Sequence, residues 1–222
     1  GVFALLAGLI VDLAGDDPNN IIITLTPLLY YALTVIIGLA FMVFVFYPII
    51  IFSFTGITFK KFLKAIFPAQ MLAFSTSSSA ATLPVTMKRV EKNLNVSDEV
   101  TSFVCPLGAT INMDGTSIHQ AISAVFIAQA FGQDLTLVDQ LAIVLTATLS
   151  SIGAAAVPGA GLIMLVIVLG AIGIDPQGLA LIIAIDRPLD MLRTVVNVTG
   201  DATVASVVAS SEGENVKYKE NE

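Results

Sequence analysis

Polar and charged side chains recur at helical spacing in one otherwise apolar stretch near the C-terminus. Successive members lie four, three, four and four residues apart: Asp186, Asp190, Arg193, Asn197 and Asp201. At about 100° per residue they share a sector of roughly 80° on one face of a helix, and the opposite face is aliphatic. Ionisable groups inside a membrane cost roughly 2.5–3.5 kcal/mol each and indicate a functional site by default.

The charges of this stripe do not cancel. Asp114 adds a fourth carboxylate to the three of the stripe, against the single guanidinium of Arg193, which leaves an excess of three negative charges. In an alternative interpretation Arg193 and the acids neutralise one another as a packing network, but that network leaves the excess without a partner. Because burying an unpaired carboxylate is costly, we expect bound cations or shifted pKa values at this site.

The oxygen groups near these acids suit a hard cation. Further carbonyls are freed where helices unwind, and the side-chain ligands would be Asn112, Asp114, Asn197 and Asp201. The chain has one cysteine and one histidine, so it offers no Cys/His cage for a transition metal. Oxygen-only surroundings therefore favour Na⁺.

The remaining groups of the stripe suit an acidic zwitterion. The guanidinium of Arg193 can clamp a carboxylate through two N–H groups. Asp190 can hold an ammonium group, and hydroxyl and backbone N–H groups can hold a second carboxylate.

The composition requires an apolar environment around this site. Hydrophobic residues make up 56% of the 222 residues and charged residues 12%, with a mean hydropathy of +0.90. Residues 28–54 carry no charge and exceed the roughly 20 apolar residues that cross a bilayer. With a net charge of −7, we expect lipid and no nucleic acid as surroundings. Residues 1–13 are apolar but lack the features of a signal peptide, so we expect helices upstream of this chain.

The basic residues predict the topology. Eight of the ten fall in three groups: Lys60, Lys61 and Lys64; Lys88, Arg89 and Lys92; Lys217 and Lys219. The positive-inside rule places these groups in the cytoplasm, which predicts a multi-pass protein of the plasma or inner membrane. Residues 16–20, 132–139 and 170–177 contain no Lys or Arg and are expected outside.

This topology predicts an all-α membrane protein, an inverted-repeat transporter with two re-entrant helical hairpins and two broken transmembrane helices. Partial transmembrane helices cover 1–61, the transport core 62–208 and a disordered cytoplasmic tail 209–222. The core comprises a first hairpin at about 62–90, a broken helix at 98–132, a second hairpin at 138–173 and a polar last helix at 177–208. If both hairpins were ordinary spanning helices, the basic group at 88–92 would lie outside.

The motifs of these segments resemble the dicarboxylate/amino acid:cation symporter family, the glutamate transporters, from residue 1 to about 208. They are the serine-rich tip Ser77–Ser79 followed by Thr82–Pro84, the run Leu107–Thr116, Ser151–Gly153 with Val157–Gly161, and Asp190–Thr194 with Asn197–Asp201. The resemblance implies a homotrimer that takes up aspartate or glutamate with Na⁺ by elevator-type alternating access. It also implies that the protein is not an enzyme and has no organic cofactor.

The resemblance implies substrate roles by position. Arg193 with Thr116 would hold the side-chain carboxylate of the substrate. Asp190 would hold the α-amino group, and Asn197 with Ser79 the α-carboxylate. The other implied substrate-binding residues are Val157, Gly161 and Thr194.

It also implies three sodium sites. The first would use carbonyls of Gly108, Asn112 and Asn197 with the carboxylate of Asp201. The second would use backbone groups of Thr110, Ser151, Ile152 and Ala154. The third would use Asn112 and Asp114, together with an earlier helix that this chain lacks.

Three departures from the family pattern matter. Ala80 and Ala81 at the first tip change its flexibility, and Ala154 replaces a frequent threonine at a position that resembles a carbonyl ligand. Gln120 stands where animal carriers have a glutamate linked to proton cotransport, which argues for sodium coupling without that proton carrier. His119 could titrate, but a lone membrane histidine is more often a packed, hydrogen-bonded one.

Three other functions account for part of this pattern. A carrier of C4-dicarboxylates or neutral amino acids is the alternative of the same fold, although Arg193 disfavours a neutral substrate and Asp190 a simple diacid. An ion channel needs a continuous wet path, which the two tips would block. An intramembrane hydrolase using Ser79 and Asp114 would lack a base for the serine.

Overall fold

The computed structural model describes residues 18–220, and the prediction for residues 1–13 lies outside this range. Within it the chain is built of helices and turns, without strands. The elements in chain order are α2 (Pro18–Phe41), the π-helix η1 (Met42–Phe46), α3 (Tyr47–Thr55), α4 (Phe59–Thr76), α5 (Ser79–Leu94), α6 (Asp98–Ile111), α7 (Asp114–Ala130), α8 (Leu137–Ile152), α9 (Ala160–Ala171), the 3₁₀-helix η2 (Pro176–Leu181) and α10 (Ile183–Ser211).

The first three elements form one long apolar rod. Within the described residues, Leu25–Thr55 is the helical segment that is long and apolar enough to cross a membrane. A narrow stripe faces the rest of the molecule at spacings of three and four residues, through Leu28, Tyr31, Val35 and Leu39. The rod ends at Gly56, whose φ of 69° suits the left-handed cap of a helix.

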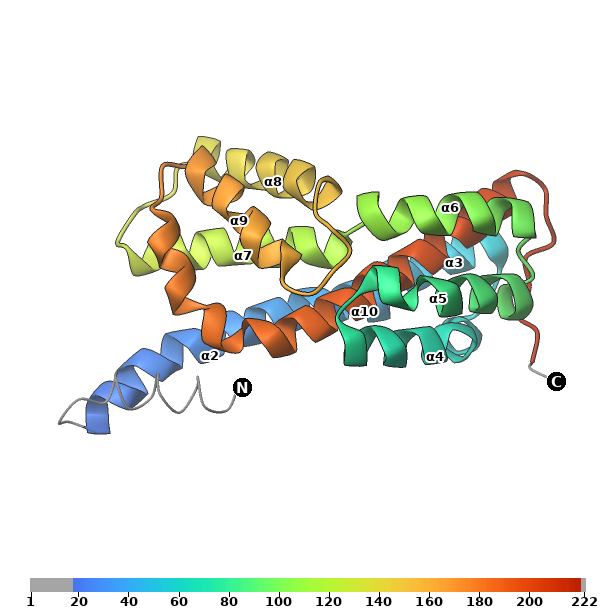
Figure 1. Ribbon diagram of the computed structural model, residues 1–222, viewed down its shortest axis with the longest axis horizontal. Helices are drawn as coiled ribbons and strands as arrows, with labels where there is room; N and C mark the ends of the chain where they lie inside the picture. Colours follow the sequence, from blue (N-terminus) through green and yellow to red (C-terminus); the bar gives the residue numbers. More distant parts are fainter. Residues whose placement is uncertain (1–17, 221–222) are drawn as a thin grey trace.

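Two antiparallel helix pairs follow the rod (Figure 1). One precedes the broken helix α6–α7 in the chain, and the other comes after it. The first helical hairpin consists of α4 and α5, whose turn holds Ser77 at φ 52°. The hydroxyl of Ser78 accepts the N–H of Ala81 and caps α5. The second helical hairpin consists of α8 and α9, joined by residues 153–159. A capping box between Thr136 and Asp139 starts α8.

The predicted broken helix is interrupted over a shorter stretch than expected. Pro106, Gly108 and Gly115 favour an unwound middle over residues 105–116, but only Asn112 and Met113 separate α6 from α7. Pro106 is accommodated inside α6. A proline removes one N–H donor, and the neighbouring hydrogen bonds continue the helix on both sides of it.

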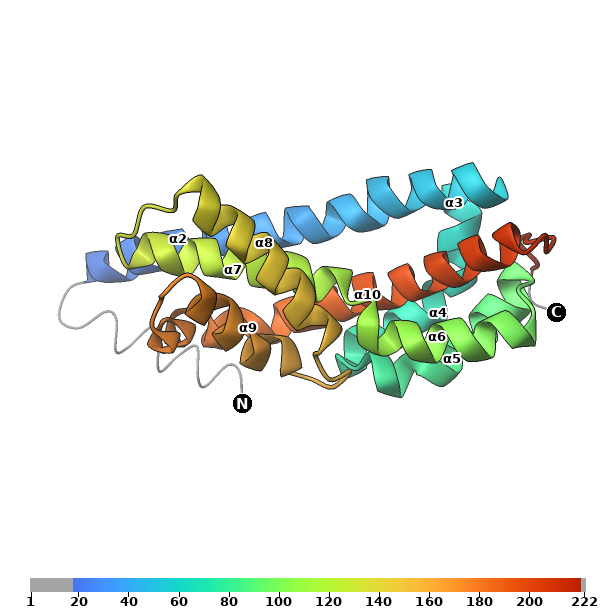
Figure 2. The same cartoon turned by 90° about the horizontal axis from the view of Figure 1, so that it is seen from above.

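The last helix occupies the centre of the molecule. α10 contacts both hairpins, α6, α7 and the long rod, as the two perpendicular views show (Figures 1 and 2). The prediction of a second broken helix is wrong here, because α10 runs without interruption from Ile183 to Ser211. The hydroxyls of Thr199 and Thr203 donate to carbonyls four residues earlier, so the polar stripe is compatible with regular helix.

The predicted disorder of the tail is also wrong for residues 209–220. Residues up to Ser211 belong to α10, and the following segment packs on the turn between α5 and α6. Val216 is buried there, and the N–H of Lys217 donates to the carbonyl of Leu94 at 3.0 Å. Composition alone suggested a solvated end, but these contacts give the segment apolar burial and backbone partners.

Two apolar clusters flank the polar centre of α10. One joins α2, α7, α8, α9 and the first half of α10, and the other joins α3 to α6 and its second half. Large apolar side chains also cover the outside, with Leu137, Val138 and Ile163 more than 70% exposed. Such an outer surface suits lipid, and the polar site lies between the two clusters.

Candidate functional site

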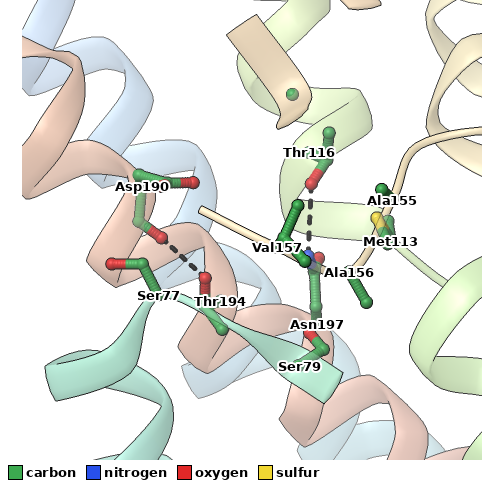
Figure 3. Close-up of a pocket in the computed structure, with 11 residues that line it drawn as sticks. Ser77, Ser79, Met113, Thr116, Ala155, Ala156, Val157, Asp190, Thr194 and Asn197 are labelled. Atoms are coloured by element: carbon green, nitrogen blue, oxygen red, sulfur yellow. Dashed lines mark hydrogen bonds between the residues drawn. The ribbon is translucent and has the colours of Figure 1, made fainter. Parts of the chain in front are cut away.

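The two hairpin turns, the break between α6 and α7, and the middle of α10 surround a small cavity (Figure 3). Its volume is about 20 Å³, and its lining residues are Ser77, Ser79, Met113, Thr116, Ala155, Ala156, Val157, Gly161, Asp190, Thr194 and Asn197. The expected substrate residues therefore lie together, except that Arg193 does not line the cavity. Four lining residues were missed, because the backbone of a turn rather than a chemical signature brings Ser77, Met113, Ala155 and Ala156 here.

The turns of the two hairpins touch each other. The carbonyl of Ala156 accepts the hydroxyl of Ser78 at 2.7 Å and the N–H of Ala80 at 3.3 Å. The donors are the N-cap residue and the second residue of α5, and the N–H groups at such a helix start have no helical partners. Ala156 therefore closes the second hairpin onto the first.

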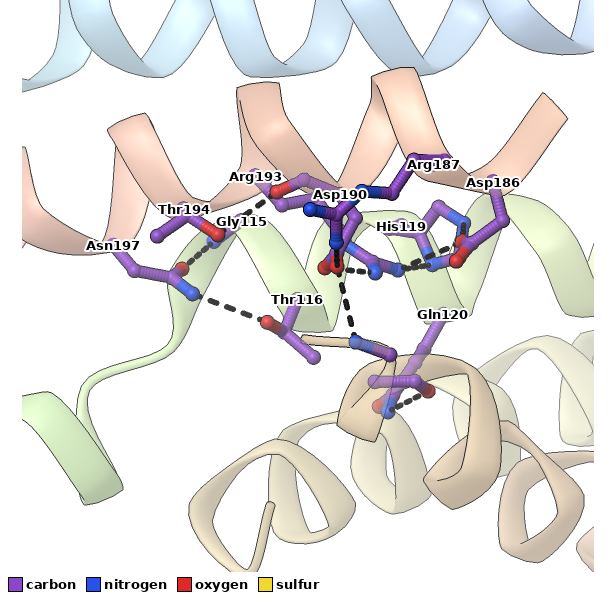
Figure 4. A network of polar contacts seen from close by, with 12 residues as sticks. Gly115, Thr116, His119, Gln120, Asp186, Arg187, Asp190, Arg193, Thr194 and Asn197 are labelled. Atoms are coloured by element: carbon purple, nitrogen blue, oxygen red, sulfur yellow. Dashed lines mark hydrogen bonds and ion pairs between the residues drawn. The ribbon is translucent and has the colours of Figure 1, made fainter. Parts of the chain in front are cut away.

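Arg193 and Asp190 form the charged centre of the site (Figure 4). The side chain of Arg193 is 1% exposed, and its Nη2 donates to Oδ1 of Asp190. The other carboxylate oxygen of Asp190 accepts the N–H of Gly159 at 3.0 Å. Asp190 thus joins the guanidinium on its own helix to the turn of the second hairpin.

Arg187 is a second guanidinium beside this pair and adds a positive charge that the charges of the stripe and Asp114 do not include. Its Nη1 lies 3.7 Å from Oδ2 of Asp190, and its side chain is 43% exposed. The excess among these groups is therefore two negative charges rather than three. An exposed ion pair stabilises little, so Arg187 compensates Asp190 only weakly.

His119 and Asp186 complete the surroundings of Arg193. The Nη1 atom of Arg193 lies 2.6 Å from Nδ1 of His119 and 3.4 Å from Oδ1 of Asp186. His119 is fully buried and also contacts Tyr31, so it is packed and hydrogen-bonded as expected. The sequence alone did not indicate that its partner is the arginine of the stripe.

Thr116 and Asn197 join the start of α7 to α10. The amide of Asn197 donates to Thr116 Oγ1 at 3.2 Å, and its oxygen accepts the N–H of Gly115 at 2.9 Å. Gly161 lies between this pair and the arginine. A Cβ added to Gly161 would be 3.0 Å from Thr116 Cγ2 and 3.2 Å from Arg193 Nη1. This close approach favours glycine.

Gln120 holds the second hairpin from α7. Its Nε2 donates to the carbonyl of Gly161 at 3.0 Å, and the side chain is fully buried. An uncharged amide at this position can donate to a carbonyl, which an ionised carboxylate cannot do.

The groups expected at the first sodium site are also close together. Oδ1 of Asp201 accepts the amide of Asn112 at 3.1 Å, and Asp201 is 2% exposed. A Cβ on Gly108 would be 2.6 Å from the same oxygen, so glycine leaves this carboxylate open towards α6. These oxygens fit a hard cation, although the carbonyl of Asn197 lies inside a continuous helix.

The expected second and third sodium sites differ in how their groups are arranged. Thr110 lies in the last turn of α6, and Ser151, Ile152 and Ala154 lie at or just after the end of α8, which contacts α6. Helix C-termini expose carbonyls and favour cations. At the third site, Asp114 Oδ2 accepts the hydroxyl of Tyr47 from α3 at 2.8 Å. The described residues hold no cluster of three or more His, Cys, Asp or Glu side chains suited to a metal.

Comparison with known proteins relates this arrangement to transporters. The model of the sodium:dicarboxylate symporter family matches residues 1–211. A putative sodium-dependent excitatory amino acid transporter of Caenorhabditis elegans is 43% identical over 208 residues, which are 94% of this chain and 41% of that protein.

Two vertebrate proteins are also similar to this chain. Human excitatory amino acid transporter 2 is 46% identical over 178 residues, 80% of this chain and 31% of that protein. Excitatory amino acid transporter 1 of Ambystoma tigrinum is 47% identical over 178 residues, 80% of this chain and 33% of that protein. The chain therefore spans about two fifths or less of the length of these relatives.

Proposed function

Because the chain belongs to the sodium:dicarboxylate symporter family, we propose that the full-length protein takes up an acidic amino acid together with Na⁺. It is a membrane protein of a transporter family, and the resemblance inferred from its motifs is confirmed. One observation carries the proposal: Asp190 lines a cavity between the two hairpin turns, and the buried Arg193 is bound to the same carboxylate directly behind it. A guanidinium and a carboxylate at one cavity match the opposite charges of an acidic zwitterion.

In this proposal each polar group of the substrate has a partner on one of three elements. The side-chain carboxylate pairs with Arg193 and Thr116, and the α-amino group pairs with Asp190. The α-carboxylate pairs with Asn197 and the N–H groups at Ser79, where α5 begins. Val157, Gly161 and Thr194 line the same cavity and would enclose the rest.

Binding requires the second hairpin to move. A cavity of about 20 Å³ holds little more than one water, far less than an amino acid occupies. The N–H of Gly159 donates a hydrogen bond to Asp190, so the ammonium group of a substrate would compete with it for the same carboxylate. The hairpin turn would then shift and close again over the substrate. This competition supports hairpin gating as part of an elevator-type cycle.

Sodium is the proposed second substrate. Asp201, Asn112 and the carbonyl of Gly108 would hold one ion, and the exposed ends of α6 and α8 another through Thr110, Ser151, Ile152 and Ala154. Asp114 and Asn112 would contribute to a third. Cations at these acids reduce the negative excess near the substrate. The affinities for ion and acidic amino acid then rise together and reciprocally.

The membrane arrangement is part of the proposal. Both hairpins would be re-entrant and inverted relative to one another, with the groups Lys60–Lys64 and Lys88–Lys92 and the tail in the cytoplasm. The protein would lie in the plasma or inner membrane. We expect a homotrimer whose contacts are made mainly by helices outside this chain.

A C4-dicarboxylate carrier is the second candidate, which the dicarboxylate in the family's description favours. A diacid would satisfy Arg193 but would leave Asp190 without an ammonium partner, so we place the amino acid first.

The test is isothermal titration of the purified full-length protein with L-aspartate, L-glutamate, succinate and L-serine, with and without Na⁺. We expect tight, sodium-dependent binding of aspartate or glutamate and weak binding of succinate and serine. Tightest binding of succinate would replace the amino acid by a dicarboxylate, and binding that ignores Na⁺ would contradict symport. Sodium-driven accumulation of substrate in proteoliposomes separates a carrier from a channel.

A further inference from the structure

His119 lies in a buried polar network between α7 and α10 (Figure 4), and it also contacts Tyr31 of α2. It projects from α7 and has no exposed surface. Its Nδ1 faces Arg193 of α10 at 2.6 Å, and its Nε2 faces the hydroxyl of Tyr31 of α2 at 2.9 Å. His119 does not line the cavity, so any effect on a substrate acts through Arg193.

The contact with Arg193 determines which ring nitrogen carries the proton. A guanidinium has five N–H donors and no acceptor, so Arg193 must donate to Nδ1. Nδ1 therefore holds a lone pair, and the proton of the neutral ring is on Nε2. A doubly protonated ring would place N–H against N–H and cation against cation. The hydrogen bond thus requires neutral His119 with its proton on Nε2.

The far side of the ring is held by a second hydrogen-bond chain. The Nε2–H group can donate to Tyr31, whose hydroxyl donates in turn to Ser123 at 2.8 Å. This arrangement gives both ring nitrogens of His119 and the Tyr31 hydroxyl a compatible partner. Tyr31 and Ser123 fix the ring so that Nδ1 points at Arg193.

Asp186 compensates charge without directing Arg193. Its Oδ1 lies 3.4 Å from both Arg193 Nη1 and His119 Nε2, and this oxygen has no hydrogen bond. The titratable and charged groups that face His119 are thus Tyr31 from α2 and Asp186 and Arg193 from α10. The directional contacts of the guanidinium are Asp190 at Nη2 and His119 at Nη1.

We propose that His119 is a positioning residue for Arg193, whose Nδ1 lone pair orients the guanidinium and thereby sets the preference for acidic over neutral substrates. The inference rests on the proposed function. Two fixed contacts hold a planar guanidinium in one orientation, whereas the Asp190 contact alone allows it to rotate. A carboxylate clamp depends on the orientation of the guanidinium plane. Loss of the His119 contact therefore weakens the binding of acidic substrates more than the binding of neutral ones.

The matched pair of variants is His119→Asn and His119→Leu in the full-length protein. Asparagine and leucine have nearly the same shape, but only asparagine presents an acceptor, Oδ1, near the position of Nδ1. A hydrogen bond to a charged group corresponds to about a tenfold to hundredfold change in affinity. We expect His119→Leu to lower the ratio of aspartate to serine affinity by this factor and His119→Asn to retain most of it.

The control is Ser206→Ala, which removes a buried hydroxyl of α10 that donates to the carbonyl of Ala202 and belongs to no contact of His119 or Arg193. We expect its affinity ratio to stay within about threefold of wild type, since its effect on Arg193 is indirect. If His119→Leu does not fold, His119→Phe keeps the ring volume without the acceptor and replaces it. Sodium-dependent thermal stabilisation of each variant reports that the protein is folded.

Equal affinity ratios for His119→Asn and His119→Leu, whether both wild-type or both reduced, overturn the inference. Such a result leaves the proposed function intact if the wild-type protein binds aspartate with Na⁺. A wild-type protein that binds no acidic amino acid overturns the proposed function and this inference together.

Discussion

The N–H of Gly159 donates a 3.0 Å hydrogen bond to Oδ2 of Asp190, which links the turn of the second hairpin to the central helix. Oδ1 of the same carboxylate binds Arg193. One side chain thus contacts both the moving part that we propose and the group that would recognise acidic substrates. In the proposed function, Asp190 therefore couples substrate recognition to hairpin closure.

The variant Asp190→Asn tests this coupling. It removes the negative charge that would pair with an ammonium group and that balances the buried Arg193. We expect aspartate affinity to fall at least about a hundredfold, because a buried charge pair broken on one side costs roughly 3–5 kcal/mol. Succinate has no ammonium group and should lose less. Titration calorimetry with both ligands measures the ratio of aspartate to succinate affinity. If this ratio is the same in Asp190→Asn and wild type, Asp190 does not bind the ammonium group.

The variant Arg193→Ala tests the carboxylate clamp. We expect the affinity for aspartate to fall by about a hundredfold, since hydrogen bonds to charged groups contribute roughly 1.5–3 kcal/mol each. Serine binding should be retained. Arg187→Ala is the matched control on the same helix, because its half-exposed side chain contributes little. Competition binding gives the selectivity, and a retained preference for acidic substrates refutes the clamp.

The variant Asp201→Asn tests the first sodium site. The amide keeps the shape of the carboxylate but removes its charge, so we expect the sodium concentration for half-maximal substrate binding to rise at least about tenfold. Asp134→Asn, in an exposed loop, controls for the loss of one negative charge. Sodium titrations at constant ionic strength provide the measurement. If the sodium concentration for half-maximal substrate binding is unchanged in Asp201→Asn, Asp201 is not a sodium ligand.

The variant Gly108→Ala tests the close approach of α6 to α10. A methyl group would lie 2.6 Å from Asp201 Oδ1, so the carboxylate has to turn away from Asn112. We expect a loss of about 1–3 kcal/mol in stability and weaker sodium binding. The control is Gly170→Ala, where a Cβ would meet nothing within 4 Å. Thermal unfolding at increasing Na⁺ concentrations compares the two variants. An equal rise of the unfolding temperature with Na⁺ in both argues against a sodium site at Gly108.

The variant Glu214→Ala tests the docking of the tail. The carboxylate of Glu214 accepts the N–H of Ser97 at 2.8 Å and its hydroxyl at 2.6 Å, at the start of α6. Without it, amide exchange at Ser97 should accelerate by about tenfold, as expected for the loss of a hydrogen bond to a charged group. Glu212→Ala, an exposed residue of the same tail, is the control. Hydrogen-exchange mass spectrometry shows whether only Glu214→Ala has this effect.

Helix content, the two hairpins and the polar stripe could be predicted because each depends on residues near one another in sequence. Apolar runs require helices in lipid. Gly159 marks one turn through the backbone freedom of glycine, and the serine-rich run 75–79 interrupts the apolar pattern at the other. The spacing from Asp186 to Asp201 determines a shared helix face whatever packs against it. The family motifs added the expected partners of Asp190, Arg193 and Asp201.

Only the tertiary structure decided which groups these side chains contact. The approach of α7 brings His119 to Arg193, and the hairpin turn brings Gly159 to Asp190, across 74 and 31 residues of sequence. The tail was predicted to be disordered because its composition is polar, yet Val216 is buried against the first hairpin and α6. Helical periodicity follows from local geometry, whereas such pairings depend on how whole helices pack, which no single segment encodes.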